Sequence, residues 1–523
     1  MKTFAVILFL ISVSELYGQI VMIPDTSFKQ RLIALGIDTN NDGEISYDEA
    51  AIIDSLSIVD DSIADLTGIE AFVNVQFLDC SRNLLDTLDL TNNLLLQDLN
   101  CMHNELTILD ISANGLLKNL NTFGNQLSTV NFSNNNLLEK LICSLNPLSS
   151  IDLSNLLLLK RLEIIGSHLN TLSLANNHQL EFLTCGSNYF QSIDLSTLSN
   201  LYYLDCCSGD LVTLDVSHNQ KLQFLDCTWN ELQTLLVSNN DSLKEINCSY
   251  NKLTHLNVTD APNLKSLGCT LNNVSSLTIN NMHKLTDLNC DFNRLTTLDV
   301  SGDTALFHLN CNDNLMTSIK FDNNVSLENL YCSHNHLTGI NINEAPNLRY
   351  LECYYNSFQT LTVVHPILTD LFCSWNSSLS LIDISQSTNI SNLQMNGMPQ
   401  HIKVCVWTLP FPPTDPYVIT GEIGSPDIHY ELCPVGVENQ YQNMEVEVFP
   451  NPFSDFVNLT VRELGDYNFE ITIIDNLGRM ILSLNETFPA GSIRLETNTL
   501  SPGLYLLEIR NGKNKIYHRI IKE

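Results

Sequence analysis

The sequence predicts a mostly-β solenoid with a small helical cap before it and a β-sandwich after it. Three observations support this architecture. A 21-residue pattern recurs through most of the 523 residues, an acidic loop lies between two helix-like segments near the N-terminus, and alternating apolar runs fill residues 446–523. A hydrophobic content of 44% indicates a packed core rather than a disordered acidic chain.

The chain is strongly acidic, which limits its partners. It contains 58 Asp and Glu residues against 25 Lys and Arg residues, a formal net charge of −33. Such a surface repels phosphate backbones and anionic lipids, so we expect no nucleic acid and no bare membrane among the partners. Neutral or cationic ligands and divalent cations suit this charge better.

Residues 1–18 have the pattern of a secretory signal peptide. Lys2 precedes an apolar run from Phe4 to Val13, and we expect cleavage between Gly18 and Gln19. The run is too short for a permanent anchor and no later run is long enough, so we expect no transmembrane segment in the mature chain. Export would bring the protein to an oxidising compartment where disulfides can form.

An acidic loop within residues 19–62 has the spacing of a calcium-binding EF-hand loop. Gly43 stands at the sixth position, where such a loop turns sharply, and the ligand positions hold Asp38, Asn40, Asp42, Glu44 (by its carbonyl), Ser46 and Glu49. We expect a structural Ca²⁺ that rigidifies an EF-hand-like helical cap over the first coil, because solenoid ends need a polar cover. The alternative is an acidic helix-capping turn that binds no ion.

The repeat occupies residues 63–400 and aligns on a column of cysteines. Its consensus, LxxLxCxxNxLxxLxVSxNxx, is that of a leucine-rich repeat in which cysteine replaces the third leucine. Thr122 and Ile164 fill the cysteine position in two copies, which gives about 15 coils. The cysteines of the column are Cys80, Cys101, Cys143, Cys185, Cys206, Cys227, Cys248, Cys269, Cys290, Cys311, Cys332, Cys353 and Cys373.

The spacing within the repeat assigns a place to each column. Leu-x-Cys is a short strand whose alternate residues point inward, so the coils should stack into a parallel sheet. The asparagine three residues after the cysteine can bond backbone groups of neighbouring coils and form an internal ladder. Twenty-one residues leave little room for a helix, so the opposite side of each coil should be extended or irregular.

The cysteine column could hold core thiols, disulfides or metal ligands. Free cysteine behaves as a small hydrophobe, and neighbouring side chains on parallel strands point side by side, which matches disulfide geometry poorly. Because Thr122 and Ile164 replace cysteine in two copies, packing explains the column best. Cys207 follows Cys206 and should face outward, as a free thiol or a cross-link.

This cysteine-bearing repeat resembles the extracellular leucine-rich repeats of the internalin group, with internalin J-like cysteine ladders, and those of secreted Bacteroidetes proteins. The resemblance covers residues 63–400. It implies a binding scaffold whose usual role is adhesion, and it names no ligand.

The repeat pattern ends near residue 398, and residues 401–436 should cover the last coil. Cys405 and Cys433 lie in this segment outside the 21-residue register. Two isolated cysteines in an exported segment should pair as a disulfide, with two free thiols as the alternative. Residues 437–445 have the composition of a polar linker.

Residues 446–523 alternate apolar and polar residues between turns, which predicts a small antiparallel, Ig-like β-sandwich. The segment resembles the type A sorting domain of the Bacteroidetes type IX secretion system. The matching residues are Pro450, Asn451, Pro452, the turn from Asp475 to Gly478, Gly503, Tyr505 and the basic end with Lys522. The resemblance implies export by the type IX secretion machinery, followed by release or attachment at the cell surface. An adhesive β-sandwich is the alternative.

Aromatic residues form a strip at positions that should face outward on the strand side. They stand three residues before or two after the cysteine, and two carboxylates stand one residue before it: Phe182, Tyr203, Asp205, Phe224, Asp226, Trp229 and Tyr250. Such a strip predicts a binding site for a protein or glycan ligand. The alternative is that aromatic residues simply favour strands. A second cluster, of Tyr350, Tyr354, Tyr355 and Trp375, either continues the strip or packs against the C-terminal cap.

We therefore expect an exported recognition or adhesion protein and no enzyme. The 13 histidines are scattered, His334 and His336 supply only two imidazoles, and no glycine-rich phosphate loop or serine elbow occurs. A structural protein of the envelope or matrix, without a discrete ligand, is the alternative. An enzyme-associated module is a third possibility.

Overall fold

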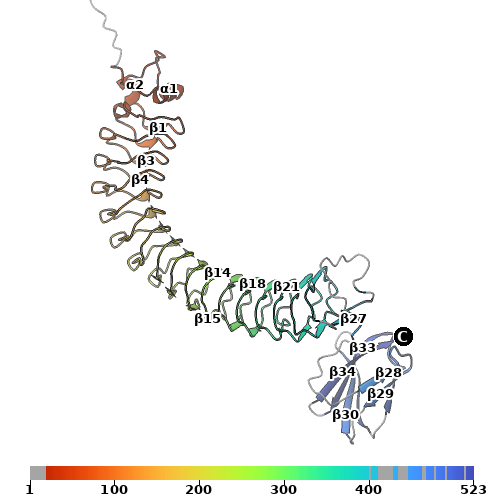
Figure 1. Cartoon of the computed structure of the whole chain (residues 1–523). Helices are drawn as coiled ribbons and strands as arrows, with labels where there is room; N and C mark the ends of the chain where they lie inside the picture. Colours follow the sequence, from red (N-terminus) through yellow and green to blue (C-terminus); the bar gives the residue numbers. More distant parts are fainter. Residues whose placement is uncertain are drawn as a thin grey trace, which may run out of the picture.

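The computed structural model describes residues 19–363, 365–399, 402–409, 411, 428–433, 446–461, 467–475, 479–488, 492–511 and 514–523. The predicted signal peptide at residues 1–18 lies outside them. Most of the chain forms a curved solenoid of stacked coils, and a small all-β domain follows it (Figure 1). Within the described part of the chain, no helix is both long and apolar enough for a membrane span.

One strand from each coil joins a parallel sheet of 17 strands, which lines the inner, concave side of the arc (Figure 1). Neighbouring strands pair at the repeat spacing, as Leu204 does with Leu225. The strands are β1 (Ser55–Ser57), β2 (Phe77–Asp79), β3 (Asp98–Asn100), β4 (Asn119–Asn121), β5 (Lys140–Ile142), β6 (Arg161–Glu163), β7 (Phe182–Thr184), β8 (Tyr203–Asp205), β10 (Phe224–Asp226), β12 (Glu245–Asn247), β14 (Ser266–Gly268), β16 (Asp287–Asn289), β18 (His308–Asn310), β20 (Asn329–Tyr331), β21 (Tyr350–Glu352), β23 (Asp370–Phe372) and β25 (Asn392–Gln394).

The stack is longer than the cysteine pattern indicated, because β1 and β25 add a coil at each end. At the cysteine position these coils carry Ile58 and Met395, which are fully buried. β1 pairs Ser55 with Phe77, so the stack begins before residue 63, where the sequence placed its start. The two end coils escaped the alignment because they lack the cysteine and their spacing differs from 21 residues.

The opposite, convex side is extended, and in the later coils it forms short strands. These are β9 (Thr213–Asp215) with β11 (Thr234–Leu236), β13 (His255–Asn257) with β15 (Ser276–Thr278), β17 (Thr297–Asp299) with β19 (Ser318–Lys320), and the row β22 (Thr360–Thr362), β24 (Leu381–Asp383), β26 (Lys403–Cys405) and β27 (His429–Glu431). No helix occurs in the described coils after the short 3₁₀ helix η1 (Ile69–Ala71). The expectation of an extended convex side is confirmed, and β26 and β27 continue it into the predicted C-terminal cap.

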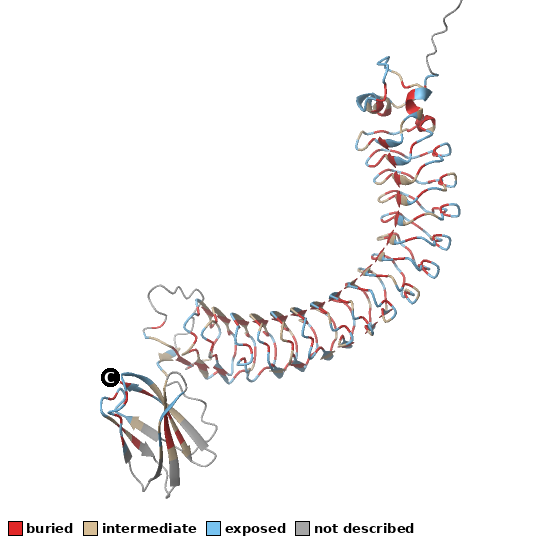
Figure 2. Cartoon of the chain, turned by 180° about the vertical axis from the view of Figure 1, so that it is seen from behind, coloured by how far each residue is buried: buried red, intermediate tan, exposed pale blue. Residues whose placement is uncertain are grey.

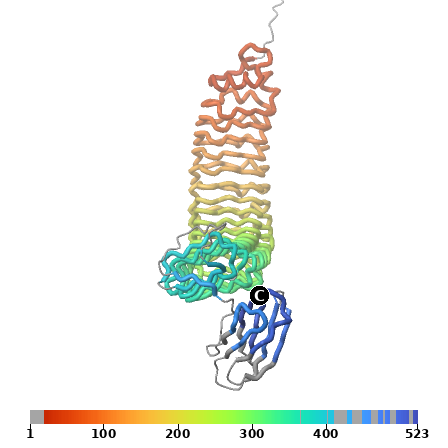
Figure 3. Tube along the Cα trace, turned by 90° about the vertical axis from the view of Figure 1, so that its right-hand side faces the viewer, coloured from red at the N-terminus to blue at the C-terminus, as the bar shows by residue number. Residues whose placement is uncertain are grey.

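The cysteine column is core. Its cysteines are buried free thiols, and Thr122 and Ile164 are buried in the same row. Burial raises the pKa of these thiols, for Cys101 to about 12, so they stay protonated and unreactive. Buried residues recur along every coil (Figure 2), and the coils stack as regular rungs (Figure 3). The predicted packing role of the column is confirmed.

The asparagine ladder holds neighbouring coils together as predicted. In one rung, Asn251 Nδ2 donates to the carbonyls of Cys227 (2.9 Å) and Cys248 (3.1 Å), while its Oδ1 accepts from Leu232 N (2.9 Å). Equivalent bonds recur from Asn83 to Asn376. Each buried amide therefore satisfies backbone groups that the turn after the strand would otherwise leave unpaired.

Two short helices precede the first coil: α1 (Thr26–Ala34) and α2 (Tyr47–Ala51). Phe28 and Leu32 of α1 are buried in one continuous core with Phe72 of the solenoid. Asp25 caps α1 by accepting from Ser27 N and Phe28 N, and its other oxygen accepts from Ala64 N (2.8 Å) and Asp65 N (3.1 Å). One carboxylate thus ties the helices to the first coil.

The last 78 residues form two antiparallel sheets. One contains β28 (Val446–Phe449), β29 (Phe456–Val461) and β32 (Ser492–Glu496), and the other contains β31 (Met480–Phe488), β30 (Tyr467–Asp475), β33 (Gly503–Asn511) and β34 (Asn514–Lys522). Phe453, Val457, Ile471 and Leu507 belong to a core that is separate from that of the solenoid. The predicted turns at residues 476–478 and 512 lie outside the described residues.

Candidate functional site

The predicted strip on the concave face contains a stack of three aromatic rings. Phe182, Tyr203 and Phe224 begin β7, β8 and β10, and their ring centroids lie 4.3 and 4.5 Å apart with nearly parallel planes. The Arg161 guanidinium lies 3.7 Å from the Phe182 centroid and ends the stack. In-register pairing produces this stack, because equivalent positions of parallel strands lie one strand spacing apart.

A second row lies at the rim of the sheet, two residues after the cysteine position. The backbone φ at this position is positive in all 17 coils, from Asp60 (61°) to Gly397 (62°). Glycine adopts such a φ without strain, whereas bulky side chains do so rarely. Nevertheless only three coils carry glycine here, and the row includes Trp229, Tyr250, Phe292, Tyr355 and Trp375. The aromatic residues are therefore kept at a position whose backbone disfavours them.

Trp229 and Tyr250 form a stacked pair in this rim row. Their ring centroids are 3.8 Å apart, and Trp229 is 58% exposed. The structure thus brings the predicted aromatic residues together as two adjacent groups, the three-ring stack on the strands and this pair at the rim. We call these five residues, Phe182, Tyr203, Phe224, Trp229 and Tyr250, the first aromatic cluster.

The two predicted carboxylates stand beside the stack and also brace the turn that follows each strand. Asp205 Oδ1 accepts from Cys207 N (3.1 Å), and Asp226 Oδ1 accepts from Thr228 N (2.9 Å) and Thr228 Oγ1 (2.7 Å). Burial, together with Asp205 and Asp226, raises the pKa of Tyr203. The surface around the three-ring stack therefore carries a negative electrostatic potential.

The second cluster lies on the same concave face. Trp375 is 50% exposed and Tyr355 44% exposed, and their rings stack at 5.6 Å. On the strands, Tyr350 lies between Tyr331 (4.8 Å) and Phe372 (5.2 Å). We call Tyr331, Tyr350, Tyr354, Tyr355, Phe372 and Trp375 the second aromatic cluster. Tyr331 and Phe372 were missed in the sequence because they stand one residue before the cysteine, a position that carries Asp or Asn in most other coils.

The charged side chains on this face are almost all negative. Between Phe182 and Trp375, ten coils present four outward positions each, and these forty residues include twelve aromatic residues and eight carboxylates but no Lys or Arg. Basic residues occupy the same positions only in earlier coils, as Arg82, Lys140 and Arg161. The face therefore combines aromatic surface with negative potential over the C-terminal two thirds of the solenoid.

The acidic loop near the N-terminus is closed by hydrogen bonds of its own. Asp38 accepts from Asp42 N (3.2 Å) and Gly43 N (3.0 Å), and Glu44 turns its carboxylate outward to Lys29 (2.5 Å). Asn40 Oδ1 likewise accepts from Asp42 N (2.8 Å).

Glu49 is held from both ends of this loop. It accepts from Thr39 N and Thr39 Oγ1 with one oxygen (both 2.8 Å), and from Ser46 N and Ser46 Oγ with the other (both 2.9 Å). Burial by itself would raise the pKa of Glu49, but these bonds lower it to about 2. Ser46 and Glu49 form a capping box at the start of α2.

The donor set of the loop suits Ca²⁺, which prefers six to eight oxygen ligands. The carboxylates are not gathered around one point, however. Among the described residues, the one group of three potential ligands within 4.8 Å of one another is Cys405, Glu431 and Cys433, and it does not include Asp38, Asp42 or Glu49. Calcium binding by this loop stays a prediction.

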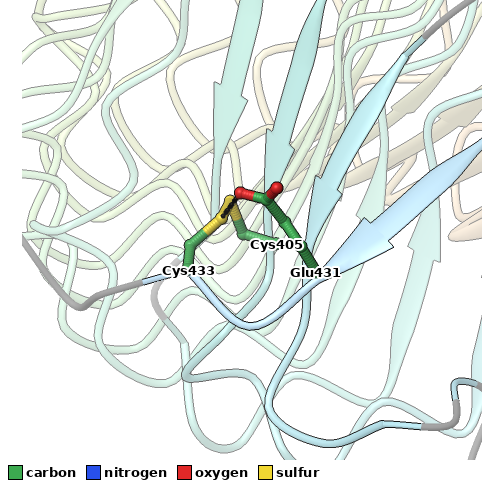
Figure 4. Close-up of side chains that lie close together, drawn as sticks. All are labelled: Cys405, Glu431 and Cys433. Carbon is green, nitrogen blue, oxygen red and sulfur yellow. Dashed lines mark hydrogen bonds between the residues drawn. A yellow bond between two sulfur atoms is a disulfide. The ribbon is translucent and has the colours of Figure 1, made fainter.

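The predicted disulfide between Cys405 and Cys433 is present, with Cα atoms 5.0 Å apart, and it joins β26 to the end of β27 (Figure 4). Glu431 Oε1 lies 3.1 Å from Cys433 Sγ and also pairs with Lys403. Because both sulfurs are in the disulfide, they are not available to a metal ion. The remaining off-register cysteine, Cys207, is a half-buried free thiol, and burial and Asp205 raise its pKa to about 11.

The predicted sorting residues lie where the first segment of the C-terminal domain meets its last strand. Asn451 Nδ2 donates to Arg519 O (2.7 Å), and Ile521 N donates to Asn451 Oδ1 (2.8 Å). Tyr505 Oη donates to Ser501 O (2.8 Å), and the Lys522 ammonium lies 5.6 Å from the Phe453 ring. Pro450 and Pro452 flank Asn451, and Gly503 opens β33. The two ends of the domain are thus joined by side-chain contacts.

Comparisons with known proteins agree with both parts of this architecture. Residues 447–523 match the family described as "Secretion system C-terminal sorting domain". Among solved structures, the chain is similar to the functional domain of InlJ from Listeria monocytogenes, described as including a cysteine ladder, with 21% identity, coverage of 97% of this chain and 99% of that one, and a TM-score of 0.54. It is also similar to a TDR receptor (17% identity, 74% and 90% coverage, TM-score 0.48) and to the internalin InlF of Listeria monocytogenes (18% identity, 77% and 96% coverage, TM-score 0.36). No curated protein sequence matches the chain.

The chain is therefore an internalin J-like leucine-rich-repeat solenoid that carries a type IX secretion sorting domain at its C-terminal end. The sorting domain implies contact with the type IX secretion machinery. The protein is accordingly secreted or attached to the outer-membrane surface.

Proposed function

We propose that the concave face of the solenoid recognises a protein or glycan ligand outside the cell, so that the protein acts in recognition or adhesion. The observation that carries this proposal is the rim row, where Trp229, Tyr250, Tyr355 and Trp375 stand at a positive φ that favours glycine. Packing gives no reason for these rings, because they are at least 37% exposed. Exposed aromatic groups with ordered neighbours are typical of binding hot spots.

The alternative is a structural protein of the envelope without a discrete ligand. A purely structural coil needs its cysteine, leucine and asparagine columns, and these are buried whatever the concave face carries. An envelope role would therefore leave the rim free to take glycine or short polar residues, as Gly124, Ser187 and Ser208 do in other coils. No observation on the described residues favours a catalytic role, and the absence of activity stays an expectation.

Cys207 provides a test of ligand placement. It is the one half-exposed thiol among the described free cysteines, and it lies on the concave face two residues after Asp205. In the native chain, alkylation at pH 9.5 followed by peptide mass analysis should modify Cys207 slowly, because its pKa is raised to about 11, and should leave the fully buried column unmodified. A ligand identified on a glycan array or by pull-down from cell-surface extracts should slow this modification at saturation. If the ligand leaves the rate unchanged and also binds the Tyr203→Ala, Trp229→Ala and Glu352→Gln chains like wild type, it binds elsewhere and the proposal fails.

We further propose that the loop from Asp38 to Glu49 binds one structural Ca²⁺. When bound, the ion would supply positive charge that draws the loop oxygens together and stiffens the link between α1 and α2. The residues that would hold it are Asp38, Asn40, Asp42, the Glu44 carbonyl, Ser46 and Glu49. Glu49 would exchange some of its bonds to Thr39 and Ser46 for the ion.

Titration calorimetry with CaCl₂ on the full chain should show one site that Glu49→Gln removes. Glu44→Gln is the matched control, because Glu44 would offer only its carbonyl and its carboxylate pairs with Lys29. Bound Ca²⁺ should also raise the melting temperature of the wild-type chain, since the ion binds only the folded loop. Calcium-independent melting together with no binding heat would show that the loop is only a helix-capping turn.

A further inference from the structure

We infer that the second aromatic cluster is a site for a positively charged side chain, so that the partner on the concave face presents an arginine or lysine there. The inference rests on the proposed function and specifies the chemistry of the ligand. Two observations support it: hydrogen bonds fix Glu352 beside several aromatic rings, and the surrounding face carries carboxylates.

Glu352 is the centre of the site. It ends β21, and it is fixed by three hydrogen bonds: Tyr350 Oη donates to Oε2 (3.1 Å), and Asn312 Nδ2 and Ser333 Oγ donate to Oε1 (both 3.2 Å). These donors come from three different coils. The Tyr354 hydroxyl is a further hydrogen-bonding partner of Glu352. A carboxylate held in this way keeps one orientation and presents a fixed negative charge on the concave face.

Aromatic rings surround this carboxylate. Tyr350 lies between Tyr331 and Phe372, with centroid separations of 4.8 and 5.2 Å, and His308 extends the row beside Tyr331 at 5.0 Å. Ring faces attract cations, and more strongly where water is partly excluded. A guanidinium suits such a site best, because its flat cation can stack on a ring while it lies against a carboxylate.

The electrostatic potential around Glu352 is negative. Burial raises the pKa of Tyr331, and Glu352 and Asp370 raise it further. Burial also raises the pKa of Asp313, with Asp291 and Glu352 adding to the effect and His334 opposing it. The nearest arginine along the chain, Arg349, stands at the edge of the sheet and pairs with Glu328 (3.5 Å). The ten coils from Phe182 to Trp375 carry no Lys or Arg at an outward position, so no basic side chain at these positions offsets the carboxylates.

A neutral ligand would fit this surface less well than a cation. Covering Glu352 and Asp370 with uncharged groups would remove water from two carboxylates without supplying a counter-charge, which is costly. A cationic group would instead relieve the repulsion among the carboxylates. Charge complementarity therefore favours a basic segment of a protein over an uncharged glycan at this part of the face.

The test uses a fluorescent peptide in which four arginines alternate with serines, and the same peptide with neutral citrulline in place of arginine. Anisotropy titrations of the full chain at 0.15 M salt should show binding of the arginine peptide and at least tenfold weaker binding of the citrulline peptide. Glu352→Gln and Tyr350→Leu should each weaken binding of the arginine peptide at least tenfold. Asp79→Asn is the matched control: it removes one carboxylate from the same column of the sheet, at β2, and should change the affinity less than twofold.

Two outcomes would overturn the inference. Equal binding of both peptides would show that the site does not select charge, and equal effects of Glu352→Gln and Asp79→Asn would show that the acidic surface attracts the peptide without a site. The proposed function is tested separately by the protection of Cys207. A captured neutral ligand that protects Cys207 and ignores Glu352→Gln would leave the proposed function standing while the inference fails.

Discussion

Asp303→Asn should stabilise the protein at pH 8 and have almost no effect near pH 4. Asp303 stands in a second buried column, on the convex side, where other coils carry Asn93, Asn114, Asn219 and Asn324. In that column each Nδ2 donates to two carbonyls, as Asn324 does to Val300 O (2.8 Å) and Asp303 O (3.3 Å). An ionised carboxylate cannot make these bonds, because it has no proton to donate.

The ionised Asp303 side chain therefore leaves hydrogen-bonding groups of this column unsatisfied. Its Oδ1 accepts from Met282 N (2.6 Å), but its Oδ2 is buried without a hydrogen-bond partner among the described residues. Burial raises the pKa of Asp303 to about 7, with Asp299 adding to the effect and His283 opposing it. In the protonated form, Oδ2 could donate to a carbonyl as the asparagines do.

The direction of the pH effect follows from this raised pKa. Below pH 4 the side chain is protonated in both the folded and the unfolded chain. Between pH 4 and pH 7 the unfolded chain releases the proton first, so the free energy of unfolding falls as pH rises, and above pH 7 the loss is complete. A shift of about 3 units at about 1.4 kcal/mol per unit corresponds to a loss of about 4 kcal/mol.

Urea unfolding of wild-type and D303N chains at pH 4.5 and pH 8 measures this loss. The D303N chain should be more stable than wild type by a few kcal/mol at pH 8, with most of that gain absent at pH 4.5. D110N, which alters an exposed convex-side carboxylate, should show no such pH-dependent gain. A D303N effect that is the same at both pH values would contradict the raised pKa.

Much of the fold follows from the sequence because each coil repeats the same physical solution. The cysteine column, the leucines beside it and the asparagine ladder could be placed from spacing alone, since an in-register stack brings equivalent side chains together. The end coils with Ile58 and Met395 could not be placed in this way. They lack the cysteine by which the other coils were aligned, and their spacing from the neighbouring coil differs from 21 residues. The positive φ of the rim row was equally hidden, since tryptophan or tyrosine at that place gives no signal of a left-handed backbone.

The candidate site was predicted only in part, for a related reason. Phe182, Tyr203 and Phe224 occupy one column, so their stacking could be expected from register. The site around Glu352 draws Asn312, Ser333 and Tyr350 from three coils and from different columns, and no periodic pattern marks it. The candidate site is made of residues that depart from the repeat, and such departures can be brought together only once the coils are placed in space.

We propose that the ligand is bound by the concave face and not by the buried columns of the repeat. Tyr203→Ala combined with Trp229→Ala removes the middle ring of the three-ring stack and the most exposed ring of the rim pair. Buried aromatic contacts at binding hot spots contribute about 2 kcal/mol or more each, so loss of both should weaken ligand binding by about a thousandfold. The double variant should keep its fold, because both substitutions leave the cysteine and asparagine columns untouched.

The affinity of this double variant for the ligand that protects Cys207 is the most direct test. Ile108→Ala with Leu157→Ala is the matched control, because it removes two exposed apolar side chains, 76% and 56% exposed, from positions outside the concave columns. We predict that the control binds like wild type, and that the Tyr203→Ala, Trp229→Ala chain melts like wild type but no longer binds. Unchanged affinity in that folded double variant would contradict the account.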